Sequence, residues 1–385
     1  MSAGMHIVLY NLTTTTLVGG VESFVWDLGR ELAQRGQRVT IIGGVGSQRA
    51  VLPGVRVITF PFIGRDYWRA LPPFRRVYGL TKLFERLSFA VPALAGLARE
   101  HPDIVHIQKP YDLGPALLLR RMTGARLVFG CHGKDFFPGD QLLGRRADIA
   151  VSCSRFNAET VAAHYGIMPR VVYNGVDFDL FRPVPPDPAL RRHYAPDGAA
   201  LLLFVGRLIP WKGVQYILQA LVELPHTRLL IAGDGSYRAH LAWLAETFHV
   251  AERVTFLGAV PRTELPRLYA GVDLVVGASF ANETFGIALV EAQACGTPVV
   301  ASNFGGFPEV VRPGETGLLV RPQHPWALAE GLRELLDDPQ RRAQMGQAGR
   351  DWVTAQFSWA SVTERVLAAY DEGRRTKDRC GTDDG

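Results

Sequence analysis

Short apolar runs that alternate with helix-period segments are the dominant pattern of this chain. In the first half, the run His6–Tyr10 precedes a segment with apolar residues on one helical face, which Gly36 closes, and then the run Arg38–Ile42. Similar runs follow at residues 103–107, 126–129, 148–152 and 171–173. Nearly continuous apolar runs are typical of parallel strands that helices cover on both faces. The pattern therefore predicts a doubly wound α/β domain over residues 1–182.

The same rhythm starts again after a proline-dense segment. The stretch FRPVPPDPALRRHYAPDG spans residues 181–198, and its prolines cannot donate regular backbone hydrogen bonds, so we predict a linker over residues 183–199. The second series of apolar runs lies at residues 200–205, 228–232, 253–257, 273–276, 297–301 and 317–320. We therefore expect a second doubly wound domain over residues 200–356. Two such domains facing across a cleft would place the carboxyl ends of their strands, where ligands bind in parallel sheets, on both walls.

Composition limits the partners more than the fold. The 385 residues are 47% hydrophobic, which fits two domains with separate cores, and the net charge of +5 is compatible with anionic ligands or an acidic membrane surface. No arginine-rich tract or zinc-finger spacing accompanies this charge, so nucleic acid is not an expected partner. The four cysteines are scattered without a C-x-x-C pair, which fits a reducing cytoplasm.

Membrane-spanning and secretory signals are not expected. The amino-terminal stretch MSAGMHIVLYNL lacks a basic region followed by an apolar run and a cleavage site, so it reads as a first strand. The longest apolar run, residues 87–98, contains Pro92 and is shorter than the roughly 18 residues that a spanning helix needs. A cytoplasmic location is the resulting prediction.

Residues 282–301, NETFGIALVEAQACGTPVVA, hold two glutamates eight positions apart. If a helix winds from about Thr284, Glu283 and Glu291 lie on the order of 12 Å from each other. Paired acids that hydrolyse glycosides lie about 5 to 9.5 Å apart. We therefore expect the two carboxylates to bind opposite ends of an elongated polar ligand, such as a sugar nucleotide, with backbone N–H groups of Phe285 and Gly286 between them.

Two cations follow the first strand of the second series. Arg207 comes directly after the strand in FVGRLIPWKG, and Lys212 precedes a helix-period segment. A guanidinium and an ammonium at the carboxyl end of a strand can neutralise a departing diphosphate. The alternative is that both are solvated loop residues, and the neighbouring glutamate pair favours the functional interpretation.

Two features of the first domain are weaker signals. Gly19 and Gly20 open the first helix, where backbone N–H groups favour phosphate, but a plain tight turn explains them equally well. His132 follows a strand in VFGCHGKD, at the edge that would face the cleft. An imidazole there could handle protons or hold a sugar, although a lone histidine is more often structural.

A D-x-D pair and a basic segment each have two interpretations. Asp177-Phe178-Asp179 matches the metal site of metal-dependent glycosyltransferases, but Asn174-Gly175 before it signals a turn, and a turn is the interpretation that we favour. Residues 65–86, RDYWRALPPFRRVYGLTKLFER, interleave basic and aromatic side chains. This mixture predicts contact with the inner face of an anionic membrane, whereas packing by the aromatics with solvated arginines explains it equally well.

Taken together, these motifs resemble the retaining glycosyltransferases of family 4, the glycosyl transferases group 1. The motifs are Gly19-Gly20, Asn174-Gly175-Val176-Asp177, Val205-Gly206-Arg207-Leu208 with Lys212, Gly233-Asp234-Gly235, the E-x7-E pair Glu283 and Glu291, Gly305-Gly306-Phe307-Pro308-Glu309, and FSWASVTERVLAAY from Phe357. The resemblance covers nearly the whole chain. It implies the GT-B fold, with two Rossmann-like doubly wound domains and a helix at 357–371 that crosses back to the first domain. The polar composition of residues 372–385 separately predicts a mobile tail.

The resemblance also implies a reaction and a role for each site residue. It implies retaining transfer of a sugar from a nucleoside diphosphate sugar to a sugar acceptor, without a cofactor or a required metal. By the same resemblance, Glu283 contacts sugar hydroxyls, Glu291 holds the ribose, and Arg207 and Lys212 hold the diphosphate. The backbone of Phe285, Gly286 and Ile287 lines the sugar and phosphates, His132 lies beside the transferred sugar, and Gly20 approaches the diphosphate.

Other functions remain open at this point. A GT-B phosphorylase or a sugar-nucleotide epimerase would share the cleft. A phosphorylase that uses pyridoxal phosphate would need a Schiff-base lysine, and the sequence marks no lysine for this role. A non-catalytic sugar-nucleotide-binding protein would keep the same charged residues. The acceptor, the linkage and the oligomeric state are not readable from the sequence. UDP is favoured only as the commonest donor nucleotide of the family that the chain resembles.

Overall fold

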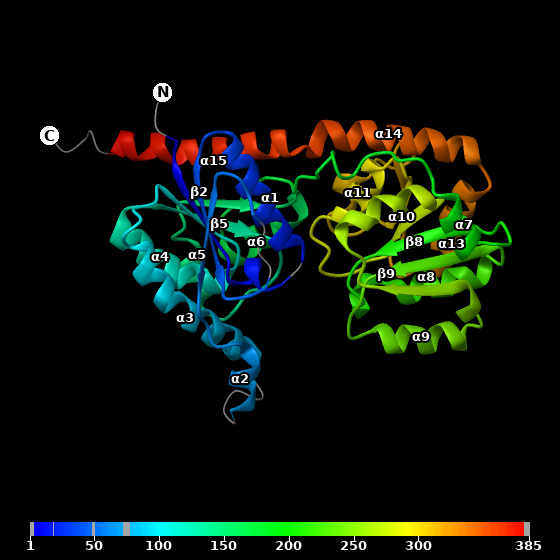
Figure 1. Cartoon of the computed structure of the whole chain (residues 1–385), viewed down its shortest axis with the longest axis horizontal. Helices are drawn as coiled ribbons and strands as arrows, with labels where there is room; N and C mark the ends of the chain where they lie inside the picture. Colours follow the sequence, from blue (N-terminus) through cyan, green and yellow to red (C-terminus); the bar gives the residue numbers. More distant parts are fainter. Residues whose placement is uncertain (1–3, 18, 48–50, 72–77, 381–385) are drawn as a thin grey trace. The chain divides into compact units, whose positions relative to one another are not determined.

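The computed structural model describes residues 4–17, 19–47, 51–71 and 78–380 (Figure 1). The chain divides into two compact units, and the first consists of Met1–Gly175 and Trp359–Gly385. The second unit is Val176–Ser358. The predicted α/β class with two parallel-sheet domains is confirmed, because each unit contains one parallel sheet with helices packed on it.

The first unit is built on a seven-stranded sheet with the order β3-β2-β1-β4-β5-β6-β7. Its strands are β1 (His6–Tyr10), β2 (Arg38–Gly44), β3 (Val55–Phe60), β4 (Ile104–Ile107), β5 (Arg126–Cys131), β6 (Ile149–Ser152) and β7 (Arg170–Val171). Its helices are α1 (Gly20–Gln34), α2 (Arg65–Ala70), α3 (Tyr78–Leu97), α4 (Leu113–Thr123), α5 (Asp140–Gly144), α6 (Arg155–Tyr165) and α15 (Trp359–Cys380).

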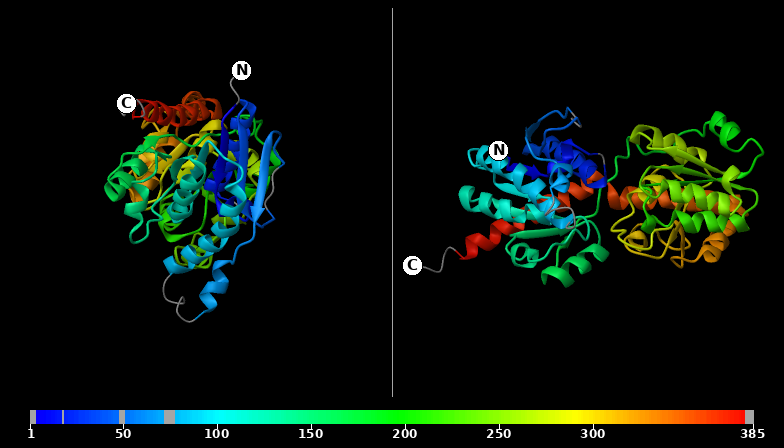
Figure 2. Two further views of the ribbon diagram at one scale, coloured as in Figure 1. Left: turned by 90° about the vertical axis from the view of Figure 1, so that its left-hand side faces the viewer. Right: turned by 90° about the horizontal axis from the view of Figure 1, so that it is seen from below.

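Successive side chains along each strand point to opposite faces of this sheet, and helices cover both faces. Ile7 and Leu9 of β1 join a core with α1 and α15, whereas Val8 joins a core with α3 and α4 on the opposite face. Figures 1 and 2 show these helices on either side of the sheet. This two-sided burial explains why the strands read as continuous apolar runs.

The second unit has a six-stranded sheet with the order β10-β9-β8-β11-β12-β13. Its strands are β8 (Ala200–Val205), β9 (Thr227–Ala232), β10 (Val254–Gly258), β11 (Leu274–Gly277), β12 (Val299–Ser302) and β13 (Gly317–Val320). Its helices are α7 (Pro188–Tyr194), α8 (Val214–Ala220), α9 (Arg238–Thr247), α10 (Leu265–Gly271), α11 (Ile287–Ala294), α12 (Phe307–Val310), α13 (Pro325–Leu336) and α14 (Pro339–Phe357). β8 and β9 supply the centre of the core, against α8 and α13.

The predicted strands are all present, with ends that differ by at most two residues, and one further strand was missed. The missed strand, β3, lies at the edge of the first sheet and pairs only with β2. Its residues are exposed or half-buried, so the segment lacks the continuous apolar run that marks the central strands.

The proline-dense segment belongs to the second unit, so it is not a separate linker over 183–199. Pro188 occupies the first turn of α7, and Asp187 caps that helix by accepting a hydrogen bond of 2.8 Å from the Ala189 N–H. Leu190 is buried, and α7 packs beside α10. Proline is therefore a helix-start signal here, and the division between the units falls at residues 175 and 176.

The carboxyl-terminal helix is longer than the sequence indicated. α15 starts at Trp359 and extends to Cys380, whereas the expected helix ended at residue 371. Polar residues beyond 371 continue the helix because no proline interrupts it. Residues 381–385 of the expected tail lie outside the described residues. The Tyr370 hydroxyl lies 2.8 Å from His106 Nδ1, and Arg126 donates a hydrogen bond to the Tyr370 carbonyl, so α15 is fixed on the first unit.

Within the described ranges, none of the helices has both the length and the apolar character needed to cross a membrane.

Candidate active site

The predicted cations lie after the carboxyl end of β8, as parallel-sheet geometry requires. Arg207 follows β8 by two residues and is exposed, and its side chain has no hydrogen bond or ion pair with the part of the chain that the structure describes. Lys212 ends a short 3-10 turn before α8. A guanidinium exposed at this edge is available to an anionic ligand.

A glycine places Lys212 against the loop after β11. Gly213 has φ = 73°, and a Cβ atom there would overlap the Ala278 carbonyl oxygen. The Phe280 N–H donates a hydrogen bond of 3.0 Å to the Trp211 carbonyl, which joins the same two segments. Only glycine permits both the left-handed conformation and this close approach.

The structure brings Lys212 and Glu283 together. Lys212 Nζ donates a hydrogen bond of 2.7 Å to Glu283 Oε2, and the buried Ser279 hydroxyl donates one of 2.9 Å to the same oxygen. Ser302 in turn donates to the Ser279 carbonyl. The Glu283 side chain is 10% exposed, so its negative charge is held by one cation and one hydroxyl in a largely buried loop.

The helix after Glu283 starts later than expected. Winding was expected from about Thr284, but α11 begins at Ile287 because Gly286 adopts φ = 98°. The estimated separation of the two glutamates by helical rise therefore does not apply. Phe285 is buried, whereas Gly286 and Ile287 form the start of α11, where first-turn N–H groups have no intrahelical acceptor. This is the kind of backbone that can donate to phosphate oxygens.

Gly305 and Gly306 support the loop from behind. Gly305 has φ = 63°, and a Cβ atom there would overlap the Glu283 carbonyl oxygen. The Gly306 N–H donates a hydrogen bond of 3.1 Å to that same oxygen. Gly305 and Gly306 therefore hold the Glu283 backbone, and they approach this loop so closely that a side chain at either position would not fit.

Glu291 lies on α11 and is buried with a different set of partners. The Tyr269 hydroxyl donates a hydrogen bond of 3.3 Å to Glu291 Oε2, and Arg262 Nε lies 3.5 Å from Glu291 Oε1. The Arg262 guanidinium also lies over the Phe181 ring, 5.2 Å from its centroid. Burial, with the Glu291 charge, raises the pKa of Tyr269 well above its usual value, so the phenol remains a hydrogen-bond donor.

His132, Gly19 and Gly20 belong to the first unit. His132 follows β5 directly, and its Nε2 lies 2.6 Å from Gln108 Oε1. Burial, with Lys109 and His106 nearby, lowers the pKa of His132 to about 3, so the imidazole is neutral at neutral pH. Gly19 precedes α1 and Gly20 starts it, and a Cβ atom on Gly20 would meet nothing within 4 Å.

A second charged cluster lies at the same edge of the first sheet. Lys82 of α3 and Lys109 after β4 each donate a hydrogen bond of 2.9 Å to Asp135. Burial would raise the pKa of Asp135, but the two ammonium groups hold it well below the usual range. The cluster carries two positive charges against one negative charge, close in sequence to His132.

The D-x-D segment has a structural role. Asp177 Oδ1 accepts hydrogen bonds of 3.1 Å from the N–H groups of Asp179 and Leu180, which is the geometry of a turn. Across the described residues, no group of three or more His, Cys, Asp or Glu side chains is arranged to hold a metal ion.

Sequence reasoning missed four residues that position the predicted ones. They are Ser279 at Glu283, Tyr269 and Arg262 at Glu291, and Gln108 at His132. Ser279 and Arg262 follow β11 and β10 closely, so their position after a strand was a usable signal. Tyr269 lies within a helix-period segment that reads as ordinary core, and only the folded chain shows its contact.

Two family models match the chain in succession. Glycosyltransferase Family 4 matches residues 18–180, and Glycosyl transferases group 1 matches residues 188–352. A GDP-mannose-dependent alpha-(1-6)-phosphatidylinositol monomannoside mannosyltransferase of Mycolicibacterium smegmatis is 35% identical over 68% of this chain and 74% of that protein. A D-inositol 3-phosphate glycosyltransferase of Mycobacterium tuberculosis (strain ATCC 25177 / H37Ra) is 38% identical over 91% of this chain and 78% of that protein.

Solved structures show the same fold at lower sequence identity. Sucrose-phosphate synthase from Thermosynechococcus elongatus superposes with a TM-score of 0.81 at 24% identity, over 96% of this chain and 98% of that one. Anabaena HepE in complex with UDP and glucose superposes with a TM-score of 0.78 at 21% identity, over 96% of this chain and 100% of that one. The chain therefore belongs to the family 4 glycosyltransferases, and its two parallel α/β units are the two domains of the GT-B fold.

Proposed function

We propose that this glycosyltransferase transfers a sugar from a nucleoside diphosphate sugar to an acceptor, with retention of anomeric configuration and without a cofactor or a required metal. The observation that carries the proposal is the charged cluster at the carboxyl edge of the second sheet. Lys212 is hydrogen-bonded to Glu283 there, and the exposed Arg207 precedes Lys212 in the same segment after β8. A diphosphate leaving group needs two such cations, because negative charge develops on it as the sugar departs.

The contacts of Lys212 and Glu283 support a role for each residue. Lys212 is paired with Glu283, so donor binding would bring a diphosphate to the ammonium group and sugar hydroxyls to the carboxylate. Ser279 holds the carboxylate in place during this exchange. Arg207 has no competing partner to lose within the described chain, and its planar guanidinium can bind two phosphate oxygens.

The remaining residues have roles in binding. Glu291, fixed by Tyr269 and Arg262, would accept hydrogen bonds from ribose hydroxyls. The start of α11 at Gly286 and Ile287 would donate backbone N–H groups to the phosphates. His132, kept neutral and oriented by Gln108, would hydrogen-bond the transferred sugar, with Gly19 and Gly20 near the diphosphate.

The proposal does not specify the donor nucleotide or the acceptor. UDP is the expected nucleotide from the family resemblance, whereas the Mycolicibacterium relative is named for GDP-mannose. Relatives are also named for inositol-containing acceptors, and the Lys82 and Lys109 pair offers positive charge to a phosphorylated acceptor. UDP- and GDP-sugars are therefore the donors to compare first.

The test measures nucleoside diphosphate release and product stereochemistry. The protein is mixed with each donor and with an inositol phosphate or lipid-linked acceptor, in buffer with excess chelator. Release that requires acceptor, together with a product whose anomeric configuration matches the donor by NMR, supports the proposal. Activity that appears only after a divalent cation is added would contradict metal independence, and an inverted product would contradict retention.

We further propose a cytoplasmic protein that contacts an anionic membrane through residues 65–86. Tyr67 of α2 is 60% exposed and Arg69 is exposed beside it, which supports the contact. Arg65 is instead paired with Glu85, and Trp68 packs against Phe84, so these two side chains stabilise the hairpin of α2 and α3. Phe74, Arg75 and Arg76 lie outside the described residues. Loss of vesicle binding in Arg69→Glu would support this contact.

A further inference from the structure

The outer face of α3 is apolar and uncovered. Leu80, Leu87 and Val91 are 38%, 39% and 71% exposed, and Ala95 is also exposed. Spacings of seven, four and four residues place these side chains on one face of the helix. They are the exposed positions among the described side chains of α3, and none is charged. We call these four residues the outer stripe of α3.

The neighbouring helices α4 and α5 also expose apolar side chains. Leu118 and Met122 are about one turn apart on α4, 50% and 51% exposed, and Leu142 of α5 is 70% exposed. α3 packs beside α4, and α4 packs beside α5. Residues 87–98, which the sequence marked as the longest apolar run, thus supply some of the exposed apolar side chains of three adjoining helices. Exposed apolar side chains that gather in one region of a surface usually mark an interaction site.

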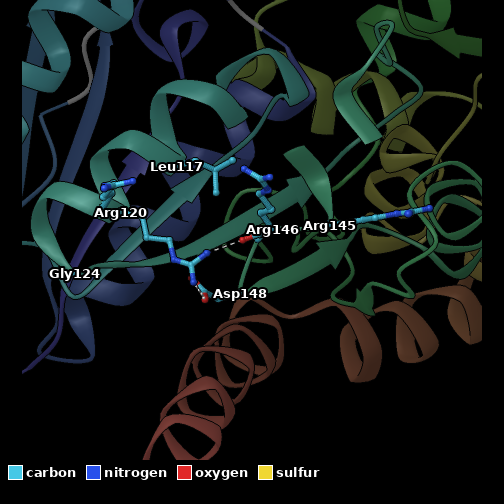
Figure 3. A pocket seen from close by; sticks show the side chains of 8 residues that line it. Leu117, Arg120, Gly124, Arg145, Arg146 and Asp148 are labelled. Carbon is cyan, nitrogen blue, oxygen red and sulfur yellow. Dashed lines mark hydrogen bonds and ion pairs between the residues drawn. The ribbon is translucent and has the colours of Figure 1, made fainter. Parts of the chain in front are cut away.

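Arginines surround a hollow at the carboxyl ends of α4 and α5 (Figure 3). Arg120 contacts Asp148 Oδ1 at 2.8 Å and donates to the Arg146 carbonyl at 2.6 Å, so it is held in place. Arg145 points away from Arg120 in Figure 3 and donates to the Tyr165 carbonyl. Arg121 and Arg146 are exposed, and their side chains have no hydrogen bond or ion pair within the described chain. Two guanidinium groups are therefore available to an anion.

Net charge separates between the two units. The first unit contains 26 Lys and Arg against 18 Asp and Glu, a net charge of +8, whereas the second contains 16 against 19, a net charge of −3. Among the described residues, exposed large apolar side chains are also concentrated in the first unit, and only Val222, Trp243 and Trp326 belong to the second. The first unit therefore has the positive net charge and most of the exposed large apolar side chains among the described residues.

We propose that the outer stripe of α3, with the exposed apolar side chains of α4 and α5, docks on a membrane that contains anionic phospholipids. The apolar side chains enter the interface, and Arg121 and Arg146 bind lipid phosphate groups. A second copy of the chain is the less favourable occupant, because it would bring two units of charge +8 together, whereas an anionic bilayer complements that charge. The proposal extends the membrane contact beyond residues 65–86 and does not rest on the glycosyl-transfer reaction.

Vesicle flotation at low ionic strength tests the proposal. The full chain should float with vesicles of phosphatidylcholine and phosphatidylglycerol, and not with phosphatidylcholine alone. The double variants Leu87→Ser/Val91→Ser and Arg121→Glu/Arg146→Glu should each lower the partition coefficient about tenfold or more. Val222→Ser and Arg192→Glu change an equally exposed apolar residue and an exposed arginine of the second unit, and should bind vesicles as the unchanged protein does.

Three outcomes would overturn the proposal. One is failure of the unchanged protein to float, and another is unchanged flotation of both double variants. The third is a dimer that light scattering shows to dissociate in Leu87→Ser/Val91→Ser, which would assign the stripe to a second copy. Inorganic phosphate is the control for the pocket, because binding of free phosphate without vesicle binding would make it a site for soluble anions. Nucleoside diphosphate binding should be unchanged in both double variants, so failure here would leave the proposed reaction untouched.

Discussion

The ion pair between Lys212 and Glu283 is the residue-scale feature on which the proposed chemistry depends. The Glu283 side chain is buried and the Lys212 side chain is half-buried, so each charge is stabilised by the other. Ser279 adds a hydrogen bond that stays with the carboxylate if the lysine turns to a phosphate. The pair therefore offers a cation and a carboxylate side by side to a substrate that carries a partner for each.

Removing either cation should slow the reaction rather than unfold the protein. Arg207→Ala and Lys212→Ala should each lower turnover by about a hundredfold or more, because a charge partner of the departing diphosphate is lost. Steady-state measurement of nucleoside diphosphate release tests this. Arg192→Ala removes another exposed arginine of the same unit and should be fully active. Turnover at the unchanged level in both site variants would refute the assignment.

Glu291 should act on binding more than on turnover. Glu291→Ala should raise the dissociation constant of the nucleoside diphosphate about tenfold or more, since hydrogen bonds to a charged group are lost. Titration calorimetry measures this constant directly. Glu246→Ala, an exposed glutamate on α9, is the matched control. If Glu291→Ala lowers turnover and leaves nucleotide affinity intact, the ribose role is wrong.

The free energy of unfolding should decrease as the pH is lowered, because His106 is buried in its neutral form. Burial lowers the pKa of His106 to about 3, whereas an unfolded histidine titrates near 6.5. Below about pH 6.5 the unfolded chain binds a proton that the folded chain does not, so stability present above that pH is lost as the pH falls toward 3. The expected slope is about 1.4 kcal/mol per pH unit.

Urea unfolding at pH 7 and pH 5 tests this linkage. The loss of unfolding free energy between the two values should shrink by about 2 kcal/mol in His106→Gln. His132, whose pKa is also lowered by burial, contributes in the same direction, so some slope should persist in that variant. An unaltered difference between the two pH values would show that His106 is not buried neutral.

At the scale of elements, α15 completes the first unit from the far end of the sequence. Val362, Val366 and Tyr370 pack in the same core as α1 and β1. The Tyr370 hydroxyl also satisfies His106 Nδ1, which would otherwise be a buried polar atom without a partner. A segment that follows the whole second unit in sequence is therefore part of the core of the first.

Tyr370→Ala should destabilise the first unit by about 3–5 kcal/mol, the usual cost of truncating a large buried aromatic side chain. Urea denaturation followed by tryptophan fluorescence would measure it. Glu364→Ala, on the exposed face of the same helix, should change stability by less than about 0.5 kcal/mol. Similar stabilities of the two variants would mean that α15 is not needed for the first core.

The elements differ in how far sequence reasoning could place them. β8 is apolar along its whole length and β1 is apolar after His6, and both were predicted with their observed bounds. β3 was missed because an edge strand with half-buried residues has no strong pattern. The proline-dense segment was taken for a linker because proline signals both helix starts and chain breaks, and the burial of Leu190 against α10 decides between them.

At the scale of the whole molecule, two separate cores predict two unfolding transitions. The core of β8 and β9 and the cores around β1 share no residues, so each unit can unfold on its own. A nucleoside diphosphate at about 100 times its dissociation constant should stabilise the unit that binds it by about 2.7 kcal/mol. Calorimetry should show this ligand raising mainly the transition that Tyr370→Ala leaves in place. A ligand that raises only the other transition would move the donor site to the first unit.

The amino-acid pattern alone was enough to predict the parallel α/β class, the positions of nearly all strands, and the residue types at the proposed donor site. It could do so because buried parallel strands are apolar throughout, and because diphosphates require cations and glycines in short, local patterns. The folded chain was needed to show that Lys212 pairs with Glu283, that Tyr269 and Arg262 hold Glu291, and that the outer stripe of α3 is exposed. These contacts join residues that are distant in sequence, or depend on which helix face its neighbours cover, so local pattern carries no information about them.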